Sequence, residues 1–453
     1  MPLLDLSLEL LEEIGSQLAQ TDHANLRTSC KVLSGAMDRL FFSVLNLKTN
    51  QLLSANGIQM LETLADGRTG WSLYARTVCI KPGNEAETQE GDDEPHLTRR
   101  ESMRDLLASA LGSMPKISTV FWDLAAPYNS WPWERKIIYN FLNTLSALDT
   151  LELNIQGVPD LSSLHVWGLR KFTVKSPNLP WRGSVFGMNP AVPAMYQEVA
   201  QLVSQNRLSS LHLEGSGEWS AVWRMLQTGN HDSDSRTKLT EITTSVVTQD
   251  LLAYLASYSG IRKLALKAPD GGSRVQSDRL ADMFFEAVLP RHGTTLTDLS
   301  CPAAYESRFS FGEHNAHFVS LLHNLSSLEM SINAGAVRRV DPPTEWVDAD
   351  GVHHRLVSVG ISIEVEQADI DPVVALLLET AAALPTLRRL AIAPAETERN
   401  RGAKCGNGRM HHQSAVCVAI AHAVRAFRSD VPCAAVVRAT AAARGNDGIS
   451  TDE

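Results

Sequence analysis

The sequence predicts an α/β protein. A small all-helical unit at the N-terminus precedes an irregular solenoid, with parallel strands on its concave face and helices on its convex face. Two observations lead to this fold. Apolar residues recur at helical spacing in residues 6–18 and 25–42. Beyond residue 70, a short apolar pattern returns many times, and helical segments separate its copies.

The first fifty residues predict two or three short amphipathic helices. Ser7 is the expected cap of the first helix, and Glu9 suits the positive end of its dipole. Its apolar stripe consists of Leu10, Leu11, Ile14 and Leu18. A second stripe, after expected caps at Thr21 and Asp22, consists of Leu26, Cys30, Leu33, Met37 and Phe41. So small a unit is hard to stabilise alone, so its apolar faces need each other, the following domain or a partner.

The repeating pattern is apolar-x-x-apolar-x-apolar. Its clear copies are Ile117/Val120/Trp122, Leu148/Leu151/Leu153, Leu169/Phe172/Val174, Leu208/Leu211/Leu213, Ile261/Leu264/Leu266, Leu325/Leu328/Met330, Leu356/Val359/Ile361 and Leu387/Leu390/Ile392. Weaker copies start at Ala75, Leu239 and Leu296. Four pairs of copies lie 31 residues apart. They start at residues 117 and 148, at 208 and 239, at 325 and 356, and at 356 and 387, although other intervals vary.

Helical segments fill the intervals between these copies. They comprise residues 99–114, 133–148, 248–259, 277–293 and 369–385. One helix and one short strand in roughly thirty residues is the leucine-rich-repeat scheme. The alternative is a doubly wound α/β sheet, which has longer β-branched strands and requires no such pattern.

Three insertions interrupt the predicted array, near residues 81–98, 336–354 and 396–410. The first is acidic and poor in apolar residues, which indicates a disordered loop. In the second, Asp350-Gly351 lies between strand-like arms and predicts a hairpin. The third is a basic loop that either contacts an acidic partner or has no binding role. Residues 441–453 are expected to form a disordered tail.

The composition argues against several classes of function. The formal charge of −10 disfavours nucleic acid or a membrane as the main partner. The six cysteines are scattered, which indicates free thiols in a reducing compartment, cytoplasmic or nuclear. No phosphate-binding loop, dinucleotide fingerprint or nucleophile elbow occurs, so we expect no enzyme and no cofactor.

One cluster contains residue types that bind zinc. Its members are Cys405, His411, His412, Cys417 and His422. On a helix over residues 411–429, His411 and His422 lie about 16 Å apart along the axis, because each residue adds 1.5 Å. Zinc ligands converge within about 2.3 Å of one ion. We therefore expect no metal site.

The N-terminal residues resemble the F-box family. That family opens with Leu-Pro-x-Glu-Leu-Leu-x-x-Ile, continues with Leu-x-x-x-Cys-Lys and closes with a Leu-Phe pair. Here the corresponding segments are residues 6–14, 26–31 and 40–42, in the same order and spacing. Ser7 replaces the usual proline, and Leu33 stands where an aromatic residue is common. The resemblance covers about the first tenth of the chain, and the mostly missing repeat asparagine matches the degenerate repeats of F-box proteins.

The resemblance implies a non-catalytic subunit of an SCF (cullin-RING) ubiquitin ligase. An F-box-like domain at 1–50 would dock on the Skp adaptor, and through it on the cullin-RING ligase. The repeat domain at 51–440 would bind an unknown protein substrate. The adaptor contact would involve Leu6, Leu10, Leu11, Ile14, Leu18, Leu26, Cys30 and Leu33. The alternative is a leucine-rich-repeat scaffold or sensor whose N-terminal helices are only an end cap.

Overall fold

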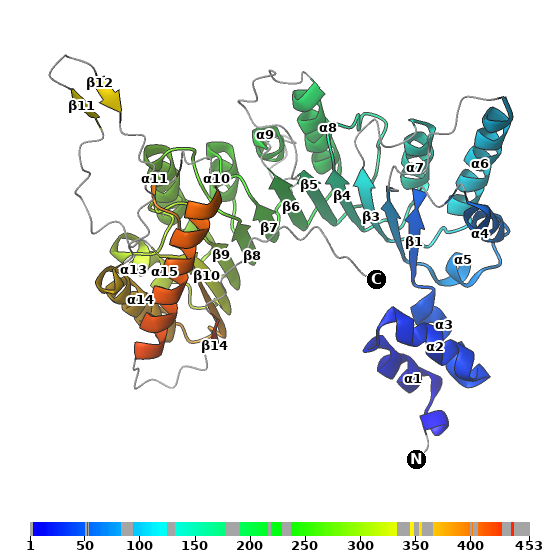
Figure 1. Ribbon diagram of the computed structural model, residues 1–453, viewed down its shortest axis with the longest axis horizontal. Coiled ribbons are helices and arrows are strands. Elements are labelled where there is room, and N and C mark those ends of the chain that lie inside the picture. The colour runs from blue at the N-terminus through cyan, green and yellow to red at the C-terminus, as the bar shows by residue number, and fades with distance from the viewer. Residues whose placement is uncertain are drawn as a thin grey trace. The chain divides into compact units, whose positions relative to one another are not determined.

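The computed structural model describes residues 3–49, 52, 54–82, 94–124, 132–176, 191–215, 219–228, 237–332, 345–347, 353–355, 366–398, 401, 406–427 and 436–438. Of residues 94–101, 132, 191–192, 345–347, 353–355, 406–412 and 436–438 it describes the backbone alone. The chain divides into two compact units, Met1–Thr237 and Lys238–Glu453. In each unit parallel strands alternate with helices, an α/β arrangement compatible with the predicted repeat solenoid (Figure 1).

Helices form the N-terminal part of unit 1. They are the 3₁₀ turn η1 (Leu3–Asp5), α1 (Leu8–Ser16), α2 (Gln20–Ser29) and α3 (Lys31–Phe41). The predicted cap of α1 is confirmed, because the Ser7 hydroxyl accepts a hydrogen bond from the Leu10 N–H at 3.5 Å. The cap predicted for α2 lies too late in the chain. Asp22 instead acts from inside the first turn, where its carboxylate accepts from the Ala19 N–H at 3.2 Å.

A break at Cys30 separates α2 from α3. Cys30 has an extended backbone, with φ −161° and ψ 163°. Arg27 and Asp38, on the two sides of the break, form an ion pair of 2.6 Å. The apolar stripe predicted from Leu26 to Phe41 therefore belongs to two helices that pack on each other.

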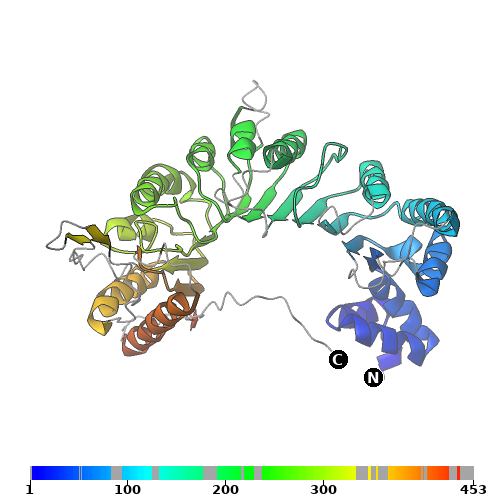
Figure 2. The same ribbon diagram turned by 45° about the horizontal axis from the view of Figure 1, so that its top comes forward.

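In the described residues, unit 1 continues with six parallel strands paired in chain order. They are β1 (Val44–Lys48), β2 (Thr77–Lys81), β3 (Thr119–Leu124), β4 (Thr150–Ile155), β5 (Lys171–Ser176) and β6 (Ser210–Gly215). Helices cover one face of this sheet (Figure 2). They are α4 (Ala55–Ala65), α5 (Gly70–Tyr74), α6 (Glu94–Gly112), α7 (Pro132–Thr144), α8 (Ala191–Gln205) and α9 (Ser220–Thr228).

The repeated pattern produces these strands through burial and turn geometry. In one copy Leu148, Leu151 and Leu153 are all buried, whereas Glu152 between them is only half-buried. Backbone hydrogen bonds between the turns at the strand entries align successive copies, as where Asp149 N–H donates to Ser118 O at 2.9 Å. A copy of this kind thus forms one strand with buried apolar side chains on one face, and one turn that stacks on the turn of the neighbouring copy.

A segment without a helix joins β4 to β5, and buried polar groups hold it. The side chain of Asn206 accepts from Leu169 N–H at 2.9 Å and donates to the Val166 and Leu202 carbonyls at 2.9 and 2.8 Å. Nearby, the Tyr139 hydroxyl donates to Asp160 O at 2.6 Å. These bonds satisfy backbone groups that no helix or strand pairs.

Unit 2 repeats the arrangement. Its parallel strands are β7 (Glu241–Thr244), β8 (Lys263–Leu266), β9 (Asp298–Cys301), β10 (Ser327–Ser331), β13 (Arg389–Ala393) and β14 (Val436–Arg438). Its helices are α10 (Gln249–Ala256), α11 (Arg274–Asp282), the π-helical turn η5 (Met283–Val288), α12 (Leu289–His292), α13 (Glu313–Ser320), α14 (Gln367–Ala382) and α15 (Gly406–Ala426). The predicted hairpin is confirmed as an antiparallel pair, β11 (Glu345–Val347) and β12 (His353–Arg355).

Most predicted copies coincide with strands, and two predictions need correction. The copy predicted at Leu356/Val359/Ile361 lies outside the described residues, and no strand from it separates β10 from β13, which pair directly. Part of the loop expected at 81–98 is helical instead, because α6 begins at Glu94, and the adjacent Pro95 is compatible with a first helical turn. The sequence predicted neither β1 nor β14.

Other predicted segments lie wholly or partly outside the described residues. These are residues 83–93, residues 399–400 and 402–405 of the basic loop at 396–410, and the tail at 441–453. None of the helices in the described part of the chain combines the length and apolar character needed to cross a lipid bilayer.

Candidate protein-docking surface

A small apolar core holds α1, α2 and α3 together. It consists of the buried residues Leu11, Leu33, Ala36 and Met37. The half-buried residues packed against this core are Leu6, Leu26, Cys30 and Leu40. Five residues predicted to contact an adaptor (Leu6, Leu11, Leu26, Cys30 and Leu33) thus belong to the core or its edge.

Close approach of the helices completes this packing. A Cβ on Gly15 would lie 2.6 Å from Met37 Cε and 2.7 Å from Leu40 Cδ1, so only glycine fits there without a shift. The His23 imidazole, which is buried, donates from Nε2 to Gly15 O at 2.8 Å, beside the backbone hydrogen bond that this carbonyl accepts from Leu18 N–H.

The three other predicted contact residues face away from the core. Leu10 is 52% exposed, Ile14 46% and Leu18 38%. Leu10 and Ile14 lie one turn apart on α1, and Leu18 follows just beyond the end of the helix. We call these three residues the α1 outer face. The predicted single stripe is therefore two surfaces, since neighbours such as Leu10 and Leu11 lie about 100° apart around a helix.

More apolar residues are exposed near the α1 outer face in the sequence. They are Leu3, Leu4 and Leu8. The prediction did not include them, although the run of leucines at the N-terminus was a signal that could have revealed them. An exposed apolar surface on a unit this small indicates a site of protein contact.

Aromatic contacts connect the three N-terminal helices to the start of β1. Phe42 contacts Trp71 edge-on, with ring centroids 4.8 Å apart, and the Trp71 indole N–H donates to Val44 O at 3.2 Å. The Arg27 guanidinium lies 4.5 Å and 4.3 Å from the ring centroids of Phe41 and Phe42. These contacts involve α2, the end of α3 and α5, and none of them involves the α1 outer face.

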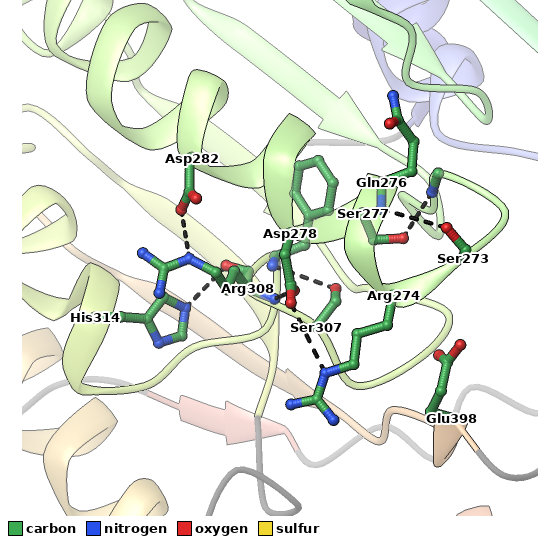
Figure 3. A network of polar contacts seen from close by, with 12 residues as sticks. Ser273, Arg274, Gln276, Ser277, Asp278, Asp282, Ser307, Arg308, His314 and Glu398 are labelled. Carbon is green, nitrogen blue, oxygen red and sulfur yellow. Dashed lines mark hydrogen bonds and ion pairs between the residues drawn. The ribbon is translucent and has the colours of Figure 1, made fainter.

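A network of charged and polar side chains lies in unit 2 around Arg308 (Figure 3). The Arg308 guanidinium pairs with Asp282, and the Arg308 backbone N–H donates to Asp278 at 2.7 Å. His314 donates from Nε2 to Arg308 O at 3.0 Å, and burial lowers the pKa of this histidine. Arg274 lies 3.8 Å from Asp278. Because these charges face opposite charges, the network fastens the segment after β9 to α11.

Arg401 forms a second polar contact in unit 2. Its guanidinium pairs with Asp270 and with Glu398, the latter at 2.7 Å, and stacks 4.2 Å from the centroid of Tyr305. This residue comes from the basic loop that the sequence identified as a possible contact for an acidic partner. Within the described part of that loop, Arg401 is engaged by residues of unit 2 itself.

The tested metal cluster is described only in part. Cys405 lies outside the described residues, and the side chains of His411 and His412 are not described. Cys417 is half-buried on α15, and burial raises the pKa of its thiol. Among the described residues, no group of three or more His, Cys, Asp or Glu side chains is placed to hold a metal ion.

Comparison with known proteins assigns no family. No protein-family model matches the chain. No curated protein is detectably similar to it in sequence.

Proposed function

We propose that this chain is the substrate-recognition adaptor of an SCF (cullin-RING) ubiquitin ligase. The three N-terminal helices dock on the Skp-family adaptor as a degenerate F-box, and the leucine-rich-repeat-like strands and helices bind a protein substrate. The chain itself is not catalytic. It tethers the substrate near the ligase and so raises the effective concentration of target lysines. This role belongs to the cytosol or the nucleus.

The observation that supports the proposal most is the division of α1 into two faces. Leu11 and Leu33 already stabilise the helices from inside, so the α1 outer face is not needed for that packing. An end cap would instead bury Leu10 and Ile14 against the first repeat. Apolar side chains on one face of a helix are the anchors that a hydrophobic groove on a partner accepts.

Co-purification with the Skp adaptor tests the proposal. The wild-type chain is compared with the double variant Leu10→Asp/Ile14→Asp at low salt. We expect the wild type to retain the adaptor and the variant to lose it by about 100-fold, because each aspartate would bury an unpaired charge in the contact. Since both positions are exposed, the variant should keep the helix content of the wild type by circular dichroism.

A matched control carries the same chemical change elsewhere. Val275→Asp/Val418→Asp replaces two exposed valines of unit 2, which are 82% and 68% exposed. This variant should bind the adaptor like the wild type. If the wild type does not retain the adaptor, the ligase role is wrong. If both double variants bind equally well, the α1 outer face is not the contact.

A further inference from the structure

The sheet of unit 1 has an open face opposite its helices (Figure 2). Parallel pairing places Lys48 beside Lys81, and Asn46 beside Cys79, which in turn lies beside Phe121. These residues alternate along their strands with buried apolar residues, so their side chains lie on the open face. We call this set the β1–β3 open face.

Lysines outnumber carboxylates on the open side of this sheet, although the whole chain has a formal charge of −10. The charged residues at the alternate positions of β1–β6 are Lys48, Lys81, Lys171, Lys175, Asp123, Glu152 and Glu214. Two of the carboxylates are already engaged, because Glu152 pairs with Lys175 at 2.6 Å and Glu214 with His212 at 3.0 Å.

Within the described part of the sheet, Lys48 and Lys81 place two positive charges side by side at the ends of β1 and β2. They are exposed partners on adjacent strands, and like charges placed opposite each other in a sheet are destabilising. Among the described residues, no carboxylate lies within 4.0 Å of either ammonium group. Asp123 lies on the next strand and supplies a single negative charge. A partner that brings carboxylates to this edge would relieve the repulsion.

Phe121 adds an apolar contact next to these lysines. It lies in the middle of β3 on the open face and is 37% exposed, with the half-buried Cys79 beside it. An aromatic side chain surrounded by polar residues is a typical anchor point of a protein interface.

The spacing of these groups matches an extended peptide. Adjacent strands lie about 4.8 Å apart and each residue rises about 3.3 Å, which places Lys81 about 8 Å and Lys48 about 12 Å from Phe121. An extended peptide covers these distances in about two to four residues.

We propose, on the basis of the proposed function, that the β1–β3 open face recognises an extended acidic segment of the substrate protein. An apolar side chain of that segment packs on Phe121, and carboxylates two to four residues away pair with Lys81 and Lys48. A nucleic acid fits less well, because single-stranded binding uses several stacking rings, whereas Phe121 is a single ring.

The test uses a fluorescent random copolymer of glutamate and tyrosine, which presents every spacing of the two residues. Its binding to the full chain is measured by anisotropy, beside polyglutamate, a lysine–tyrosine copolymer and oligo(dT). The variants are Lys48→Glu/Lys81→Glu and Phe121→Ser. The matched control is Arg104→Glu/Lys136→Glu, which makes the same change of charge at exposed positions on α6 and α7.

We expect the glutamate–tyrosine copolymer to bind best, and its affinity to fall when salt rises from 50 to 200 mM. The double lysine variant should weaken binding at least tenfold, Phe121→Ser should remove the preference over polyglutamate, and the control should match the wild type. Equal binding by all variants, or preference for the basic copolymer or for oligo(dT), would overturn the proposal. The same variants are also assayed for retention of the Skp adaptor. If they retain the adaptor but bind the copolymer like the wild type, the peptide proposal is wrong and the ligase role stands.

Discussion

Leu10 and Leu11 are adjacent in the sequence, and we predict that truncating them has opposite consequences. Leu11 is 2% exposed and packs with Leu33 and Met37, whereas Leu10 is 52% exposed. Leu11→Ala creates a cavity in the small core and should cost about 2–4 kcal/mol. Leu10→Ala removes an exposed side chain and should change stability by about 0.5 kcal/mol or less.

Amide hydrogen exchange of the full chain measures this difference locally. Since about 1.4 kcal/mol corresponds to a factor of ten, Leu11→Ala should speed exchange of the protected α1–α3 amides by roughly 30-fold to nearly 1000-fold. Leu10→Ala should leave these rates within about threefold of the wild type and should weaken only the retention of the adaptor. Equal acceleration by both variants would refute the division of α1 into a core face and an outer face.

Two further predictions concern buried polar groups. Asn206→Leu removes the partners of the Leu169 N–H and of the Val166 carbonyl, and should cost about 3 kcal/mol or more in urea unfolding, whereas exposed Gln201→Leu should cost little. The buried His292 accepts from Ile261 N–H at Nδ1 and donates from Nε2 to Leu255 O, which requires the neutral ring, and burial lowers its pKa. Below pH 6.5 the unfolded state therefore takes up a proton that the folded state excludes, so stability should fall from pH 7.5 to 5.5. In the His292→Gln variant, the urea midpoint of unfolding should fall less as the pH is lowered. An unchanged dependence of the midpoint on pH would contradict the assignment of a neutral, buried His292.

The strands were largely predictable because their signal is local. In the copy at Leu208, Leu211 and Leu213, two apolar residues of one strand face and one of the preceding turn are all buried. β1 was missed because Leu45 and Leu47 follow directly on the helical residues, and the strand becomes clear only through its pairing with β2. The copy at 356 lies outside the described residues, and the direct pairing of β10 with β13 shows only that no strand lies between these two.

For the candidate docking surface, the sequence by itself determined that the N-terminus is helical and carries more apolar residues than one stripe requires. Only the tertiary structure decided which of them remain exposed. The break at Cys30 brings α3 back against α2, and the close contact at Gly15 places α3 against α1. These contacts bury Leu11 and leave Leu10 and Ile14 open. Spacing along a helix states which residues share a face, but the neighbouring helices determine which face is covered.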